Sequence, residues 1–104
     1  MTLSQKQQAF TRAIVDLISY GHSLGYGFTL GDAFRADTCT HGHKNSTHRV
    51  RLALDLNLFI DGVYITDGNH EAWYLLHDYW DLIGGSQRIS EDMNHFSFSH
   101  NGVR

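Results

Sequence analysis

The sequence predicts a small α+β domain in which helices pack on an antiparallel sheet. Two segments carry apolar residues at the three- and four-residue spacing of amphipathic helices. A third segment alternates leucines with other residues, as a half-buried strand does, and an Asp-Gly pair typical of hairpin turns follows it. Because 104 residues are a usual size for one domain, residues 1–104 are expected to form a single unit.

The first half of the chain is expected to form a helix and then a strand. Residues 4–24 have the helical spacing, and Thr2 with Gln5 matches a capping box at the start of that helix. The apolar stripe of this helix consists of Phe10, Ala13, Ile14, Leu17, Ile18 and Leu24. A short strand is expected over residues 26–35, and the polar residues 36–47, which lack any hydrophobic period, are expected to form a loop.

The clearest strand is predicted over residues 51–60. One face of this strand carries Leu52, Leu54, Leu56 and Leu58, and the other carries Ala53, Asp55, Asn57 and Phe59. Asp61 and Gly62 then suit a two-residue turn, so residues 63–66 are expected to return as the second strand of a hairpin.

A second helix and a last strand complete the expected fold. Residues 67–69 offer an N-cap, and residues 70–83 have helical spacing up to the glycine pair at 84–85. The buried stripe of this helix is expected to contain Ala72, Trp73, Leu76, Tyr79, Trp80 and Ile83. After a polar loop over 86–93, residues 94–99 are expected to form the final strand.

Composition excludes several classes of function. The formal net charge is −3 and no long basic run occurs, so a nucleic-acid partner is not expected. No apolar run approaches the ~18 residues of a membrane span, and the polar start of the chain is unlike a secretory signal. The single cysteine, Cys39, excludes an internal disulfide framework and a cysteine-rich zinc site. The 8 histidines then need an explanation.

The candidate chemistry lies in two segments. In the first, His48 stands where the predicted strand begins, and Asp55 lies on the strand face opposite the leucines. In the second, Asp92 precedes His95 by three residues. Two histidines and a carboxylate are a frequent ligand set of catalytic zinc, and a further carboxylate can accept a proton during hydrolysis. From this spacing alone, polar groups satisfied at a sheet edge remain an equal alternative.

These residues resemble a known signature. The pattern Ser46-x-His48-x4-Ala53-x-Asp55, followed by Asp92-x-x-His95, is similar to that of the zinc peptidases of the M15 family. This family includes D-Ala-D-Ala carboxypeptidases and dipeptidases, and phage L-alanyl-D-glutamate endolysins. Its motif reads S-x-H-x-x-G-x-A-x-D, and its glycine corresponds to Arg51 here. The resemblance covers nearly the whole chain, is greatest to a compact phage branch, and implies a Hedgehog/D-Ala-D-Ala peptidase-like fold with zinc at the sheet edge.

The resemblance also implies a role for each residue of the signature. The ligands of Zn²⁺ would be His48, Asp55 and His95. Asp92 would be the general base; we prefer it to the adjacent Glu91 because the family's acid precedes its last histidine by three residues. Arg35 would bind a substrate carboxylate or steady the developing oxyanion, and Ser46 would contact the substrate.

We therefore expect a zinc peptidase that hydrolyses the L-Ala–D-Glu bond in the peptide stem of bacterial peptidoglycan. Such an endolysin would be a monomer made in the cytoplasm of the host bacterium, and a holin would release it to the periplasmic cell wall. One alternative is a D,D-carboxypeptidase or D-Ala-D-Ala dipeptidase with the same metal. A non-enzymatic alternative is an inactive metal-binding module of a virion.

The remaining histidines have simpler expected roles. His41 and His43, near Cys39, could hold a second metal ion, although a solvated loop is favoured because no strand fixes their geometry. The three on predicted helices, His22, His70 and His77, are expected to lie at the surface or to be partly buried, without partners, and His100 is expected near a frayed end.

Overall fold

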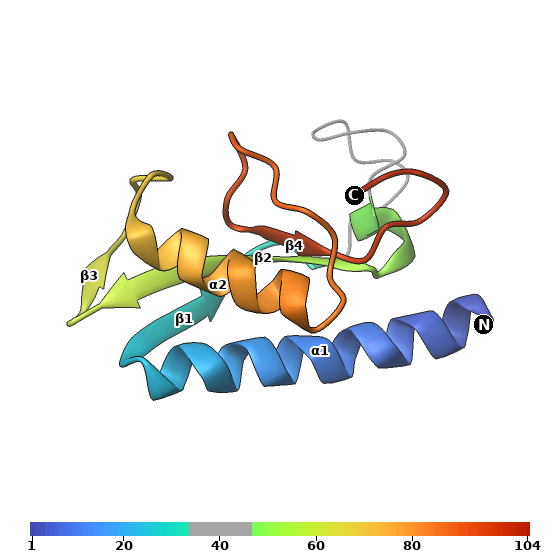
Figure 1. Cartoon of the computed structure of the whole chain (residues 1–104), viewed down its shortest axis with the longest axis horizontal. Coiled ribbons are helices and arrows are strands. Elements are labelled where there is room, and N and C mark those ends of the chain that lie inside the picture. The colour runs from blue at the N-terminus through green and yellow to red at the C-terminus, as the bar shows by residue number, and fades with distance from the viewer. Residues whose placement is uncertain (34–46) are drawn as a thin grey trace.

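The fold is organised around one long central strand, β2 (Figure 1). The computed structural model describes residues 1–33 and 47–104. Its elements are α1 (Leu3–Ser23), β1 (Tyr26–Leu30), the 3₁₀-helix η1 (Thr47–Val50), β2 (Ala53–Ile60), β3 (Val63–Tyr64), α2 (Glu71–Leu82) and β4 (His95–Ser97). β1 pairs with β2 along one edge, and β3 and β4 pair with β2 along the other, all antiparallel. The predicted α+β class is therefore confirmed.

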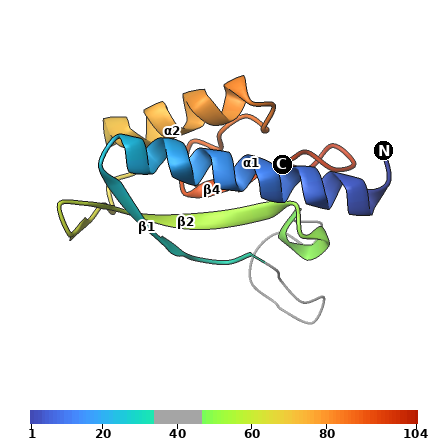
Figure 2. The same ribbon diagram turned by 90° about the horizontal axis from the view of Figure 1, so that it is seen from below.

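Both helices lie on the same face of the sheet (Figure 2). The leucines of β2 face the helices and are buried as predicted, since alternate side chains of a strand point to opposite faces. The core that they form with α1, α2 and β4 includes Phe10, Ile14, Leu17, Leu76, Trp80 and Phe96. Burying such side chains contributes about 1.5–3 kcal/mol each. The other face of β2 carries the polar Asp55 and Asn57 between Ala53 and Phe59, so a polar site can form on this face.

Helix α1 begins as the sequence predicts. The Thr2 hydroxyl accepts a hydrogen bond from the Gln5 backbone N–H at 3.1 Å, and Gln5 Oε1 accepts one from the Thr2 N–H at 2.8 Å, which confirms the capping box. Leu24 does not belong to the buried stripe: it caps the C-terminus of α1 and its side chain is 42% exposed.

Strand β1 is shorter than predicted because a bulge follows it. The Gly31 N–H donates to the Asp55 carbonyl at 2.8 Å, and the Asp55 N–H donates to the Asp32 carbonyl at 2.8 Å. Gly31 and Asp32 thus face the single residue Asp55, as in a β-bulge. A bulge ends regular pairing and bends the chain. The expected end of this strand near Arg35 lies outside the described residues.

The start of β2 also differs from the prediction. Arg51 has φ of 56°, in the left-handed region, and a residue in that conformation cannot continue a strand. Regular pairing therefore begins at Ala53, and His48 lies in η1 rather than at the entry to a strand. The predicted turn after β2 is confirmed, because Asp61 and Gly62 have φ of 51° and 77°, the two positive values of a type I′ turn.

Helix α2 starts one residue beyond the predicted boundary with a different cap. His70 is its N-cap, and its Nδ1 accepts a hydrogen bond from the Ala72 N–H at 3.1 Å, whereas Asp67 caps the preceding turn through the Asn69 N–H. His77 is fully buried and its Nε2 contacts the Met93 carbonyl, so the expectation of a surface or partly buried position without a partner is wrong. Gly84, with φ of 101°, follows the end of α2 as predicted.

The two remaining strands are shorter than expected. β3 comprises only Val63–Tyr64, and β4 only His95–Ser97. Within residues 1–33 and 47–104, no helix is both long and apolar enough to cross a membrane.

Candidate metal centre

The pairing of β4 with β2 brings two of the predicted ligands together. In this register Asp55 lies directly opposite His95, although the two residues are far apart in the sequence. Residues directly opposite in an antiparallel pair present their side chains on the same face of the sheet. Asp55 and His95 therefore meet on the face turned away from the helices.

The third predicted ligand, His48, comes from η1. Its Nδ1 lies 3.2 Å from the carbonyl oxygen of Ala33, in the segment that follows the bulge. Because a carbonyl can only accept, Nδ1 carries the hydrogen of this contact and the neutral ring is left with its lone pair on Nε2. A backbone carbonyl that fixes the tautomer and the ring orientation of a histidine is the usual outer partner of a metal-ligating imidazole.

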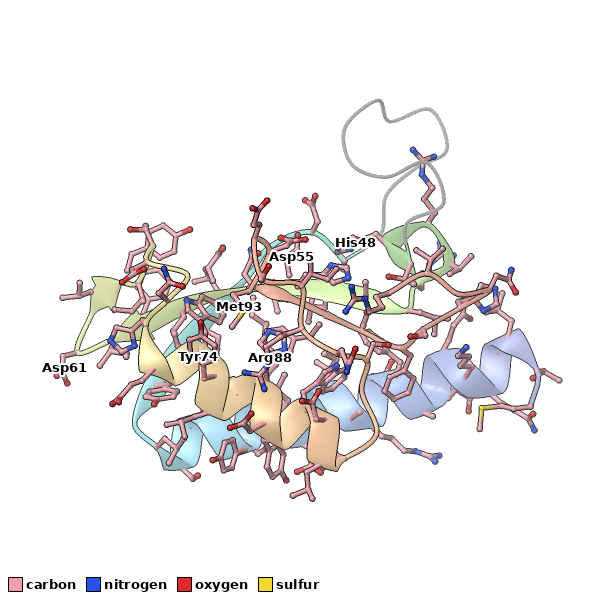
Figure 3. All side chains as sticks on the ribbon, turned by 45° about the horizontal axis from the view of Figure 1, so that its top comes forward. His48, Asp55, Asp61, Tyr74, Arg88 and Met93 are labelled. Carbon is pink, nitrogen blue, oxygen red and sulfur yellow. The ribbon has the colours of Figure 1, made fainter. Side chains whose placement is uncertain are left out.

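The three ligand atoms form a nearly regular triangle. His48 Nε2 lies 3.2 Å from Asp55 Oδ1 and 3.2 Å from His95 Nδ1, and His95 Nδ1 lies 3.4 Å from Asp55 Oδ1. Ligands of a tetrahedral zinc site, bound at 2.0–2.1 Å, stand about 3.3 Å apart. Figure 3 shows His48 beside Asp55 at the sheet surface. This buried group could hold a metal ion.

The electrostatics of the triangle also favour a cation. The side chains of His48 and His95 are 2% and 6% exposed, and that of Asp55 is 17% exposed. Burial acts to raise the pKa of Asp55, but the two imidazoles outweigh it and lower that pKa to about 2. A buried carboxylate oxygen facing ring nitrogens needs a cation, either a proton or a metal ion, to offset its desolvation.

The predicted base, Asp92, lies at the edge of this triangle. Its Oδ2 is 4.0 Å from His95 Nδ1, and its side chain is 51% exposed. A turn closed by the His95 N–H donating to the Asp92 carbonyl at 3.0 Å holds the two residues together. Asp92 also lines a cavity of about 360 Å³, together with Glu91, Asn57 and Trp73. A ligand in this cavity would therefore lie next to both acids, although none of the three candidate metal ligands lines the cavity.

The other predicted site residues cannot be placed beside the triangle. Arg35 and Ser46 lie outside the described residues, as do the candidates for a second metal site, Cys39, His41 and His43. Among the described residues, the only group of His, Cys, Asp and Glu that could hold a metal ion is His48, Asp55 and His95.

Two groups near the site were missed by reasoning from the sequence. The contact of His48 with the Ala33 carbonyl could not be predicted from the sequence, because every residue has a backbone carbonyl. His77 has a signal that could have revealed its burial: it follows Trp73 by four residues and precedes Trp80 by three, which places it on the apolar stripe of α2.

Comparison of the chain with protein-family models, curated proteins and solved structures finds no match.

Proposed function

We propose that this protein is a zinc-dependent peptidase that hydrolyses an amide bond in the peptide stem of bacterial peptidoglycan. The observation that carries the proposal is the triangle of His48, Asp55 and His95, with the carboxylate of Asp92 4.0 Å from His95 Nδ1. Structural zinc sites use four protein ligands, whereas catalytic ones use three and leave a position for water or substrate.

The backbone at Arg51 supports the resemblance to M15 peptidases. The family motif has glycine at this position, and Arg51 adopts a φ of 56°, a conformation that glycine reaches without strain. The backbone of this chain is thus compatible with a glycine at this position of the motif. This turn directly follows η1, which carries His48, and leads into β2, which carries Asp55.

In this proposal the chain's own groups orient the substrate and move the proton. A zinc ion held by the three ligands would supply Lewis acidity for amide hydrolysis. Asp92 accepts the proton of the attacking water and passes it to the leaving nitrogen, which its exposure toward the cavity permits. The Ala33 carbonyl holds the His48 ring in the orientation that directs Nε2 toward Asp55.

Metal analysis of purified variants tests the ligand assignment. We expect about one zinc per chain in the wild type, and loss of most zinc in His48→Ala and His95→Ala, because two remaining ligands bind zinc weakly. His22→Ala, at an exposed position on α1, is the matched control and should keep its zinc. Chelation should lower the melting temperature of the wild type, since a ligand of the native state stabilises it. Undiminished zinc in both ligand variants would contradict the assignment.

The mass of the peptide fragments distinguishes the proposed bond from the related one. Cleavage between L-Ala and D-Glu exposes a new amino group on Glu, whereas a D,D-carboxypeptidase releases free D-Ala. We propose the former, in the role of a phage endolysin, because the resemblance is greatest to the compact phage branch.

A further inference from the structure

The turn that carries Asp92 and His95 is held by three consecutive carbonyl groups. The Asp92 carbonyl accepts from the His95 N–H at 3.0 Å, within the turn itself. The Asn94 carbonyl accepts from the Leu56 N–H at 2.9 Å, which ties the turn to β2. Between them, the Met93 carbonyl lies 2.7 Å from Nε2 of His77 in α2. This last bond is the only one of the three made by a side chain.

His77 is built into the core with its ring fixed in place. Its side chain is fully buried, and its ring stacks on Phe96 with a centroid separation of 4.2 Å and an interplanar angle of 11°. Phe96 directly follows His95 in β4. Because the Met93 carbonyl can only accept, Nε2 is the donor, and burial lowers the pKa of His77, so the ring stays neutral.

The position of His77 links the helical layer to the candidate centre. Met93 lies between Asp92 and His95, and Figure 3 shows it between Asp55 and α2. A shift of the Met93 carbonyl must move the base or the ligand, because both are within two residues of it along the chain. The stacking of His77 on Phe96 fixes the strand on the other side of the same ligand.

We propose that His77 is a positioning residue of the metal centre, which sets His95 Nδ1 and the Asp92 carboxylate relative to Asp55 through its hydrogen bond to the Met93 carbonyl. The inference rests on the proposed function. His77 does not act as a ligand or a base, because its remaining nitrogen, Nδ1, is buried without a hydrogen-bond partner among the described residues and lies outside the group of metal-ligating atoms.

Two substitutions separate the hydrogen bond from simple packing. In His77→Gln the side-chain N–H₂ lies the same number of bonds from Cα as Nε2, so it can still reach the Met93 carbonyl. In His77→Asn the donor is one bond shorter and cannot. The zinc dissociation constant, measured by competition with a chromogenic chelator, should stay close to that of the wild type in His77→Gln. It should weaken by about 10- to 100-fold in His77→Asn, the usual effect of losing an outer partner of a metal site.

Trp80→Phe is the matched control. Trp80 Nε1 donates to the Ser97 carbonyl at 3.0 Å, so it is also a buried bond from α2 to the β4 segment, but on the other side of His95. Its loss should lower thermal stability without changing zinc affinity, because the Ser97 carbonyl keeps the Ser86 N–H at 2.9 Å. If the role of His77 were merely structural, His77→Asn would behave as Trp80→Phe does. Both proteins would be less stable, and zinc affinity would be unchanged in both.

A measurement on the wild type covers the case in which His77→Asn does not fold. Zinc binding should slow solvent exchange of the His77 Nε2 hydrogen, observed by NMR, because it orders the turn that accepts this bond. Unchanged exchange on zinc binding, unchanged zinc affinity in a folded His77→Asn, or equal loss in His77→Gln would each overturn the inference and leave the zinc site standing. A wild type that binds no zinc would instead overturn the proposed function, and the inference with it.

Discussion

Glu91 and Asp92 are neighbouring carboxylates on the same cavity, and their geometry assigns them different roles. Asp92 Oδ2 lies 4.0 Å from His95 Nδ1, and the Asp92 backbone is held by the turn that ends at the ligand. Within the described residues, no such contact to the three ligands is seen for the Glu91 side chain. Proximity to the ligand atoms therefore favours Asp92 over Glu91 as the proton acceptor of the proposed reaction.

Asp92→Asn should retain fold and zinc but lose activity by about 10²- to 10⁴-fold, since the amide has nearly the shape of the carboxylate and cannot accept the proton. Glu91→Gln is the matched control and should remain near the wild type. The measurement is the rate of lysis of permeabilised Gram-negative cells at equal protein and zinc. Near-normal lysis by Asp92→Asn with collapse of Glu91→Gln would show that the other acid is the base.

Gly31 controls how closely β1 approaches Asp55. A Cβ added at Gly31 would stand 3.1 Å from both Asp55 Cβ and the Asp55 carbonyl oxygen, tighter than ordinary contact, and these atoms cannot give way without moving the ligand. Gly31→Ala should therefore weaken zinc binding by about tenfold. A Cβ added at Gly27, in β1, would stand 3.7 Å from Phe59 Cβ, an ordinary contact. Gly27→Ala should therefore leave zinc binding unchanged. Equal zinc affinities from calorimetric titration of both variants would contradict this.

At the scale of elements, much of the fold could be predicted because it depends on side-chain periodicity. The leucines of β2, the stripe of α1 and the Asp61-Gly62 turn all act through local patterns that the sequence displays directly. The boundaries of β1 and β2 could not be predicted, because they depend on the bulge at Gly31 and on the left-handed Arg51. Both are backbone features set by contacts between distant segments.

The candidate site could also be predicted only in part. The identities of His48, Asp55 and His95 were predicted from the resemblance to the M15 motif, because their spacing alone left an equal alternative. Their meeting depends on the pairing of β4 with β2, which no local pattern specifies. The full burial of His77 was missed because no partner for it could be identified in the sequence, although its spacing from two tryptophans placed it inside.

The junction between α2 and the segment after it depends on Gly85. A Cβ there would overlap the indole ring of Trp80, which is fully buried and donates to the Ser97 carbonyl. Gly85→Ala should therefore reduce the free energy of unfolding by about 1–3 kcal/mol, the usual cost of overpacking a core.

Gly68→Ala is the control for this substitution, because its Cβ would meet Met93 Cγ at 3.9 Å, an ordinary contact. Urea denaturation of both variants measures the difference. Equal stabilities would show that the Trp80 ring can move aside.

In the whole molecule, the two faces of the sheet have different roles. The helices and the leucines of β2 form the core on one face, and the candidate centre occupies the other. The three ligands come from η1, β2 and β4, so a bound metal ion would cross-link segments that are distant in the sequence. The free energy of metal binding would then add to the stability of the fold.

Cleavage of peptidoglycan by a metal ion bound at this face can be measured directly on sacculi. Purified peptidoglycan sacculi are incubated with the zinc-loaded protein, and new amino groups are counted while the released fragments are identified by mass. We predict amino groups on Glu, released at a rate that chelation abolishes and that Asp92→Asn reduces by about 10²-fold or more. Zinc-loaded wild-type protein that releases no amino groups from sacculi would contradict the account and favour a metal-binding module without catalytic activity.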